Sequence, residues 1–412
     1  MKTNKLKILT ILGTRPEIIR LSRVMARLDE YTNHILVHTG QNYDYELNEI
    51  FFKDLEIRKP DYFLNVDTSS LGAAVGDIIR KSEEVLKKEK PDAVLVLGDT
   101  NSCLAAYMAK RLHIPIFHME AGNRCFDFNV PEEINRRIID HIADFNLVYT
   151  EHARRHLLSE GLPHRRIYLT GSPMKEVLDY YRPKIDTSTI LKDINLAENC
   201  PPLAGAGGGL IPGKYFIVSV HREENVDNPE NLKNILAILE SLVEKYNYPV
   251  IVSTHPRTLK RIEELNSSQQ SAKSEQCPPL AGAGGGQPGS QQHMIQFLKP
   301  FGFTDYVALQ MHAACTISDS GTISEESAIL SFPAISLRNS MERPEAQDAG
   351  TIILTGFNKD VVLNSIETAI AEHRSRKYNN NVADYSINDT SWRVLKLIQG
   401  LAGLSNRWHG IT

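Results

Sequence analysis

The chain has 412 residues, 42% of them hydrophobic, and a formal net charge of −4. This length is enough for two domains of ordinary size, and this hydrophobic fraction is enough for a core in each. The small negative charge excludes a general electrostatic attraction to nucleic acid or to an anionic membrane, so any bound anion must be held by local groups.

The N-terminal segment is basic, but the apolar stretch behind it, Ile8–Leu12, is too short for a signal sequence or a membrane span. The cysteines lack CxxC pairing and the spacing of a metal site, so we expect free thiols. They are Cys103, Cys125, Cys200, Cys277 and Cys315. These features predict a soluble, cytoplasmic protein.

Strand-like and helix-like segments alternate over the first 180 residues. Lys7–Leu12 reads as a strand, Glu17–Leu28 as a helix and His34–Val37 as the next strand. The alternation continues to a strand at Ile167–Leu169. This order predicts a parallel sheet covered by helices.

A second series of strands shows the same alternation. Its members are Tyr215–Val220, Val250–Ser253, Met294–Leu298, Cys315–Ser318, Ala334–Leu337 and Thr351–Leu354. We therefore predict an α/β protein with two Rossmann-like, doubly wound domains, residues 1–180 and 181–375, followed by a C-terminal segment, 376–412. The cleft between two such domains is the expected ligand site.

A ten-residue sequence, CPPLAGAGGG, occurs at Cys200–Gly209 and again at Cys277–Gly286. It is too short and too rich in Gly and Pro to be a folding unit, and the second copy lies in a stretch of linker composition. We interpret the copies as loop insertions, near 197–212 and 266–292. A phosphate-cradling role would require a strand before the loop and a helix after it, and neither copy has this context.

Carboxylates follow two buried strands where each ends. Ala93–Leu97 leads to Asp99, Ile114–Met119 leads to Glu120, and Glu132 follows a short loop further on. Ligands bind at this edge of an open α/β sheet, so the three acids are candidates for acid/base chemistry in one cleft. The alternative is that Glu132 is only a helix N-terminal acid, favoured by the helix dipole.

Candidate phosphate-binding residues follow the first strand. Gly13 permits a tight turn there, and Pro16 suits the first helical position. Arg15 would then point into the cleft, with Arg20 one turn along the helix. These residues also fit a structural role, as a helix start with surface ion pairs.

Comparable features follow the strands of the second half. The turn at residues 320–322 precedes a helix, whose exposed N–H groups and Ser hydroxyl can bind a diphosphate. Arg343 brings a guanidinium to the next strand end, and His221 brings an imidazole to the same rim. The structural alternatives are a helix cap for the turn, an ion pair for Arg343, and a histidine with ordinary hydrogen-bond partners for His221.

Seven motifs occur over nearly the whole chain, in the order GTRPE, GDTNS, HMEAGNR, VPEEINRR, SVHREEN, SDSGTISEES and ERPE. In this combination the chain resembles the bacterial non-hydrolysing UDP-N-acetylglucosamine 2-epimerase family. The resemblance implies a glycosyltransferase-B-like fold, an active site between the domains, no metal or nicotinamide cofactor, and a homodimer. It also implies a last helix that crosses back onto the first domain, for which Ser391–Leu401 is the candidate.

Longer stretches resemble one branch of this family, the UDP-2-acetamido-2,6-dideoxy-L-talose 2-epimerases, which make UDP-N-acetyl-L-fucosamine. They are HTGQNYDYELNEIFF, MEAGNRCFDFNVPEEINRRIIDH, LTGSPMKEVL, HREENVDNPEN and DSGTISEESA. The glucosamine branch typically has a Gln-His pair, Gly-Leu-Arg and Ser-Gly-Gly where this chain has Gln41-Asn42, Asn123 and Thr322. The Gln-His pair serves an allosteric substrate site in that branch, so its absence puts such regulation in doubt here.

The resemblance also implies the site residues by motif. The catalytic residues are Asp99, Glu120, Glu132 and His221, with His221 on the leaving phosphate. The substrate and UDP contacts are Arg15, Arg20, Phe301, Tyr306, Ser320, Gly321, Thr322, Glu326 and Arg343. Within this set, Arg20 stands where the family usually has lysine. Glu326 matches the glutamate expected to bridge the ribose hydroxyls, and the uracil pocket is expected near Phe301 and Tyr306.

Such an enzyme would act by eliminating UDP and adding it back, because the C2 hydrogen of an N-acetylamino sugar is not acidic. Acid/base groups are then needed on both faces of the ring, which favours epimerisation for a chain with three candidate acids. Three alternatives stay open: action on UDP-N-acetylglucosamine, a UDP-sugar-dependent glycosyltransferase on the same fold, and a non-catalytic nucleotide-sugar-binding module. The expected pathway is surface polysaccharide biosynthesis.

Overall fold

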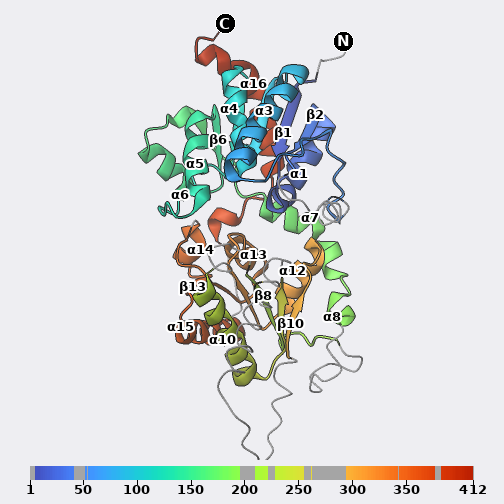
Figure 1. Cartoon of the computed structure of the whole chain (residues 1–412), viewed down its shortest axis with the longest axis vertical. Helices are drawn as coiled ribbons and strands as arrows, with labels where there is room; N and C mark the ends of the chain where they lie inside the picture. Colours follow the sequence, from blue (N-terminus) through green and yellow to red (C-terminus); the bar gives the residue numbers. More distant parts are fainter. Residues whose placement is uncertain are drawn as a thin grey trace, which may run out of the picture. The chain divides into compact units, whose positions relative to one another are not determined.

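The computed structural model describes residues 5–40, 52, 54–194, 209–220, 228–254, 261, 294–341, 343–375 and 382–411. The chain divides into two compact units, which Figure 1 shows in sequence colours. The first unit comprises Met1–Arg182, Glu342–Glu345 and Asn381–Thr412. The second unit comprises Pro183–Met341 and Ala346–Asn380.

The first unit contains a seven-stranded parallel sheet with the order β3-β2-β1-β4-β5-β6-β7. Its strands are β1 (Lys7–Leu12), β2 (Asn33–His38), β3 (Tyr62–Phe63), β4 (Ala93–Leu97), β5 (Ile116–Met119), β6 (Phe145–Val148) and β7 (Ile167–Leu169). Every residue of β4 and β5 is buried, as expected for strands covered by helices on both faces. The chain order reverses between β1 and β4, which makes their carboxyl ends a topological switch point where ligands bind in such sheets.

Helices cover both faces of this sheet (Figure 1). They are α1 (Arg15–Tyr31), α3 (Leu71–Glu89), α4 (Ala106–Arg111), α5 (Pro131–Ile142), α6 (Glu151–Ser159), α7 (Met174–Asp186) and α16 (Thr390–Trp408). Short 3₁₀ turns stand at Asn101–Ala105, His164–Arg166 and Ala383–Tyr385. Apolar side chains of α3 and α4, among them Ile78, Leu86 and Ala109, pack with the strands into one core.

The second unit contains a six-stranded parallel sheet with the order β10-β9-β8-β11-β12-β13. Its strands are β8 (Phe216–Ser219), β9 (Val250–Ser253), β10 (Ile295–Leu298), β11 (Cys315–Ser318), β12 (Ala334–Ser336) and β13 (Ile353–Leu354). Its helices are α8 (Ile190–Asp193), α10 (Pro229–Tyr246), α12 (Phe303–His312), α13 (Ile323–Leu330), α14 (Pro344–Asp348, which starts in the first unit) and α15 (Lys359–Ser375). The order reverses again, between β8 and β11. The predicted fold class, two parallel-sheet α/β domains, is confirmed.

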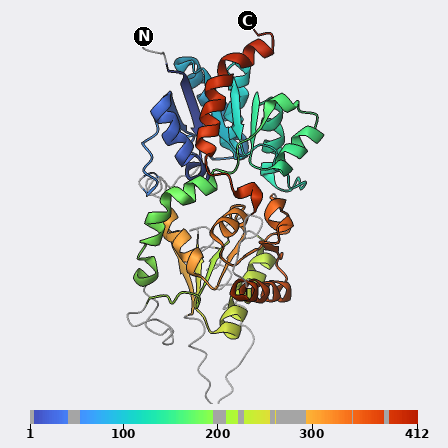
Figure 2. The ribbon, with the colours of Figure 1, turned by 180° about the vertical axis from the view of Figure 1, so that it is seen from behind.

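Helix α16 packs against α1, and Figure 2 shows both helices on the same face of the first sheet. The carboxylate of Glu176 caps its N-terminus, accepting bonds from the Ser391 N–H (2.8 Å) and hydroxyl (2.5 Å). The ring of Trp392 lies against Tyr31, at 5.3 Å between centroids, and under the guanidinium of Arg27. The helix is longer than the segment Ser391–Leu401 that the sequence indicates.

Several strands are shorter than the sequence predicts, and two of them have an identifiable reason. The strand expected at Ile114–Met119 begins at Ile116, because Pro115 has no N–H to donate to the ladder and its carbonyl accepts from Val94 instead. The strand expected at Thr351–Leu354 begins at Ile353, since the Thr351 N–H is bound to the carbonyl of Ala346.

Candidate active site

Two candidate acids stand side by side at the carboxyl edge of the first sheet. Leu97 and Met119 are paired neighbours at the ends of β4 and β5, so Asp99 and Glu120 leave the sheet at adjacent points. Gly98 and Glu120 both have left-handed backbone conformations, with φ of 70° and 64°. Such a conformation is costly for a residue other than glycine, and costs of this kind concentrate at functional sites.

Glu120 is buried and bound by two arginines. Arg20 of α1 donates to its Oε2, and Arg343 donates to its Oε1 at 2.5 Å. The Asn123 amide donates to the same Oε1 at 3.3 Å. Burial alone would raise the pKa of Glu120, but the charges of Arg20 and Arg343 outweigh it and lower that pKa to about 2. Glu120 is therefore ionised.

Asp99 is held by α5. Arg136 Nε donates to its Oδ2 at 2.6 Å, and Asn135 Nδ2 donates to its backbone carbonyl at 2.8 Å. Arg136 also contacts Glu133 at 3.4 Å and contributes to the charge around Glu120. One guanidinium thus influences both candidate acids.

The adjacent acids of the α5 first turn have different environments. Glu133 is fully buried and binds Arg136, the Arg137 guanidinium (2.9 and 3.1 Å) and the Cys125 N–H (3.1 Å). Glu132 is half-buried, and it makes no ion pair with any residue that the structure describes. The alternative of a structural helix-terminal acid therefore applies to Glu133, whereas the carboxylate of Glu132 is uncommitted.

The loop after β1 is organised by a buried carboxylate. Glu17 Oε2 accepts from the N–H groups of Gly13 (2.9 Å) and Thr14 (2.7 Å), and its Oε1 accepts from the Ser102 hydroxyl. Gly13, the glycine expected at this tight turn, is not among the described glycines with a positive φ. Its N–H bond to Glu17 shapes the turn instead, and α1 begins at Arg15, which is half-buried.

A buried charge network beneath the site joins the loops that carry both acids. His118 donates from Nε2 to the Gly98 carbonyl at 2.9 Å, and its Nδ1 lies 2.9 Å from Asp140 Oδ1, out of line for a hydrogen bond. Arg124 Nη1 donates to Asp140 Oδ2 and to the Asn123 carbonyl, both at 2.7 Å. Despite its burial, the pKa of Asp140 is lowered by His118 and Arg124.

The network closes through Glu160 at the end of α6. Arg124 forms two bonds to its carboxylate, at 2.8 and 2.7 Å, and Arg137 reaches it at 3.5 Å. Arg137 in turn binds Glu133, which contacts Arg136, the partner of Asp99. One chain of contacts therefore holds the Gly98 carbonyl, another holds the Asp99 side chain, and the two meet at Glu160.

The candidate diphosphate loop of the second unit lies between β11 and α13. The Ser320 N–H bonds to Ser318 Oγ at 3.0 Å, and the hydroxyls of Ser320 and Thr322 are 2.9 Å apart. Gly321 lies between these residues, and Thr322 is the N-cap of α13. This placement leaves the start of an eight-residue helix next to a strand end, as a phosphate site requires.

Glu326, Phe301 and Tyr306 also belong to the second unit. Glu326 is buried in α13 and accepts from Gln310 Nε2 at 2.9 Å. Tyr306 lies on α12, and burial raises the pKa of its hydroxyl, which interacts with Ser219 at the end of β8. Phe301 and Tyr306 pack against the core around Tyr215 and Ile217.

Some predictions fall outside the described residues. These are the catalytic role of His221, the positions Gln41 and Asn42, and the CPPLAGAGGG copies apart from Gly209. Cys103, Cys125 and Cys315 are free thiols, and Cys200 and Cys277 are not described. No helix in the described ranges combines the length and apolar character needed to cross a membrane.

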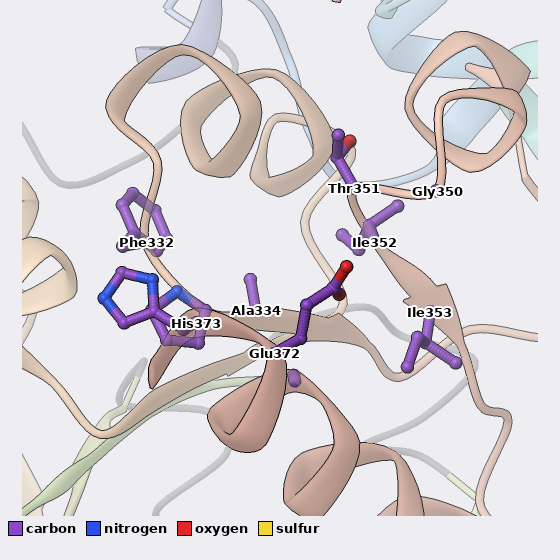
Figure 3. Close-up of a pocket in the computed structure, with 10 residues that line it drawn as sticks. Phe332, Ala334, Gly350, Thr351, Ile352, Ile353, Glu372 and His373 are labelled. Atoms are coloured by element: carbon purple, nitrogen blue, oxygen red, sulfur yellow. The ribbon is translucent and has the colours of Figure 1, made fainter. Parts of the chain in front are cut away.

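Two cavities of the second unit lie at the opposite, N-terminal edge of its sheet. One, of about 20 Å³, is lined by residues such as Phe332, Ala334 and Ile353 (Figure 3). The other, of about 210 Å³, is lined by residues that include His312 and Arg374. Both are smaller than an ordinary pocket for a nucleotide-sized ligand, and neither is lined by a candidate site residue.

Sequence reasoning missed several residues of the site. Asn123 contacts Glu120, Arg136 contacts Asp99, and Asp140 supports both loops. The sequence does contain a pattern that indicates Arg136 and Asp140. Together with Glu133 they are spaced by three and four residues, so in a helix all three lie on one face.

Residues 26–399 match the family model described as UDP-N-acetylglucosamine 2-epimerase. The structure is similar to that of UDP-N-acetylglucosamine 2-epimerase from Rickettsia bellii, at 48% identity and a TM-score of 0.84 over 98% of each chain. It is also similar to the Methanocaldococcus jannaschii UDP-GlcNAc 2-epimerase solved in complex with UDP-GlcNAc and UDP, at 32% identity and a TM-score of 0.80 over 96% of this chain and 100% of that one.

A further relative has a different named substrate. It is the UDP-2,3-diacetamido-2,3-dideoxy-D-glucuronate 2-epimerase of Pseudomonas aeruginosa, 32% identical over 372 residues, which are 89% of this chain and 93% of the relative. Similarity therefore extends over both units, and the names of the relatives specify more than one UDP-sugar.

Proposed function

Because the chain belongs to the UDP-N-acetylglucosamine 2-epimerase family, we propose that this UDP-sugar 2-epimerase inverts C2 of a UDP-2-acetamido-2,6-dideoxy-L-hexose. The L-talo sugar is converted to the L-galacto sugar, which gives UDP-N-acetyl-L-fucosamine. The enzyme acts in the cytoplasm, and its product is used to synthesise a surface polysaccharide.

The reaction proceeds by elimination and re-addition. A carboxylate takes the C2 proton, the C2–H electron pair forms a C1=C2 double bond, and the C1–O pair leaves with UDP. A proton is then delivered to C2 on the opposite face, and UDP adds back to C1. Asp99, Glu120 and Glu132 supply the acid/base groups for the two faces.

Positive groups stabilise the charge that collects on UDP as it leaves. We assign this role to Arg15, Arg343 and His221, together with the N–H groups at Ser320 and Gly321. Arg20 and Thr322 complete the phosphate contacts, Glu326 binds the ribose, and Phe301 and Tyr306 form the uracil side of the site.

One contact carries the assignment to the 6-deoxy-L-talose branch. Asn123, which replaces the leucine typical of the glucosamine branch, donates to Glu120 Oε1 at 3.3 Å. The residue that differs between the branches thus touches a candidate catalytic acid. The alternative substrate, UDP-N-acetylglucosamine, is favoured by the names of the two relatives of known structure.

A homodimer is part of the proposal. Ile134 and Ile138 lie one turn apart on α5 and expose 49% and 42% of their surface. An apolar pair of this kind supports a surface covered by a second copy.

NMR of the purified protein in deuterated water tests the function. We expect deuterium at C2 of the UDP-2-acetamido-2,6-dideoxy-L-hexose during turnover, with no acceptor present, and a kcat/KM about a hundredfold above that for UDP-N-acetylglucosamine. Preference for UDP-N-acetylglucosamine moves the protein to the alternative substrate. Complete retention of the C2 hydrogen rules out the acid/base route, and turnover only with an acceptor identifies a glycosyltransferase.

A further inference from the structure

The two arginines on Glu120 leave it poorly suited to remove a proton. Arg20 donates to one carboxylate oxygen and Arg343 to the other, and the three side chains expose only 5 or 6% of their surface. A general base is most effective when its pKa is near the operating pH, whereas these guanidinium groups hold the pKa of Glu120 far lower. Glu120 must lose part of this neutralisation before it can act on C2.

The other charged groups near Glu120 are committed elsewhere. Arg136, the third cation that acts on it, binds Asp99 at 2.6 Å and Glu133 at 3.4 Å. Glu345, two residues after Arg343, accepts from the Thr150 hydroxyl, and burial raises its pKa. The charge environment of Glu120 can therefore change only through its ion pairs with Arg20 and Arg343.

The diphosphate of a sugar nucleotide binds guanidinium groups, as the carboxylate of Glu120 does. Its oxygens accept charge-assisted bonds, and a guanidinium binds phosphate and carboxylate with the same fork geometry. Arg20 is held in the second turn of the 17-residue helix α1, whereas Arg343 precedes α14 on a four-residue segment that returns to the other unit at Ala346. Arg343 is thus the partner that can be exchanged without moving a helix.

We propose that the diphosphate of the substrate takes Arg343 from Glu120, so that substrate binding itself turns Glu120 from an ion-pair partner into a base. The proposal rests on the proposed function, since it requires a UDP-sugar at this site. Arg20 keeps its Nη1 bond to Oε2, which holds the carboxylate in position, and meets the phosphate with its other N–H groups. The free enzyme therefore holds its base neutralised, and only the complex can accept the C2 proton.

Proton uptake on binding is the direct consequence. When Glu120 loses Arg343, its pKa rises toward the ordinary range, and the complex takes up a proton fraction that the free enzyme does not bind. This uptake is measured by isothermal titration calorimetry in buffers with different ionisation enthalpies. The titrant is the equilibrium mixture of the substrate and its C2 epimer, which gives no net reaction heat.

We expect uptake of up to about 0.2 proton per site at about pH 5, falling to nearly none at about pH 8. Arg343→Gln should abolish most of the uptake, because Glu120 is already released in the free variant, and should raise KM. Arg137→Gln is the matched control, since Arg137 binds Glu133 and Glu160 rather than Glu120, and its uptake should equal that of the wild type. Asn123→Leu, which keeps both arginines, should also retain the uptake.

The outcomes separate the inference from the function beneath it. If the substrate binds at about pH 5 without proton uptake, the exchange of Arg343 is overturned and the epimerase assignment stays intact. Uptake that persists in Arg343→Gln and in Glu120→Gln assigns the proton to another group, such as Glu345, and also overturns it. If neither UDP-sugar binds or reacts, the proposed function fails together with the inference.

Discussion

Glu132 and Glu133 are adjacent in sequence and opposite in role. Glu133 is fully buried and bound to two arginines, whereas Glu132 is half-buried at the start of α5 and makes no ion pair within the described ranges. An uncommitted carboxylate can exchange a proton with a substrate, while a buried paired one cannot without breaking its pair. The two residues form a matched set for mutation.

Glu132→Gln should lower kcat by about a hundredfold or more, the loss expected when a positioned acid or base is removed. UDP affinity and the free energy of unfolding should change little, because Glu132 supports no ion pair. Steady-state kinetics, UDP titration and urea unfolding measure the three quantities. Glu133→Gln is the comparison: it should lower the free energy of unfolding by about 3 kcal/mol, since it removes a fully buried carboxylate from its pairs with Arg136 and Arg137.

Near-wild-type turnover in Glu132→Gln would return this residue to a helix-terminal role. The sequence alone allowed both interpretations, because both glutamates follow Pro131 in the first turn of a helix. Only the packing of α5 against the sheet decides which one is buried, and that depends on residues far away in the chain.

Helix α5 is the element that holds the candidate acids in place. Its Arg136 binds Asp99, and its Asp140 accepts from the Gly122 N–H at 3.3 and 3.2 Å, two residues beyond Glu120. Gly122 has a φ of 82°, and a Cβ there would lie 2.4 Å from the Ala153 carbonyl oxygen. The loop after β5 is therefore fixed from both sides, by α5 and by α6.

Asp140→Asn should lower the free energy of unfolding by about 3 kcal/mol, because it removes the buried anion that Arg124 and His118 share. Urea unfolding measures the change. Glu84→Gln is the control on α3: Glu84 is 68% exposed and pairs with exposed Arg80 at 3.2 Å, so its loss should cost less than about 1 kcal/mol. Equal effects of the two substitutions would show that the buried network adds no stability.

At the scale of elements, much of the fold follows from the sequence. Apolar runs bounded by turns predicted β4, β7, β9 and β11 with the bounds that the structure has. Strand β3 was not predicted, because Tyr62–Phe63 is too short to show a period. The sequence also did not show that the turn at Gly13 depends on Glu17 and on its distant partner Ser102.

At the scale of the whole molecule, the sequence does not show which residues far apart in the chain contact each other. Arg343 falls within the range expected for the second domain, 181–375, yet Glu342–Glu345 is part of the first unit, where Arg343 binds Glu120. The motif ERPE shows that an arginine is present, but it does not show which carboxylate the arginine meets. That information lies in a contact between residues 223 positions apart.

The acid sensitivity of the first unit follows from the signs of its pKa shifts. The pKa values of Glu120, Asp140 and Glu160 are lowered in the folded state, so these groups stabilise it above their unfolded pKa values and lose that contribution as the pH falls. Burial raises the pKa values of Glu17 and Glu345, which act in the opposite direction and gain stability as they are protonated. The three acids with lowered pKa values have the larger effect on stability, because they include Glu120 with its pKa near 2.

The first unit should therefore lose stability between about pH 5 and pH 2, with Glu120 alone contributing about 3 kcal/mol. The two tryptophans of the chain, Trp392 and Trp408, both lie on α16, so their fluorescence reports this unit alone. We expect the urea midpoint followed by tryptophan emission to fall steadily over this range. A midpoint that rises on acidification would mean that Glu17 and Glu345 outweigh the paired acids, and that the arginines around Glu120 stabilise the fold less than their geometry implies.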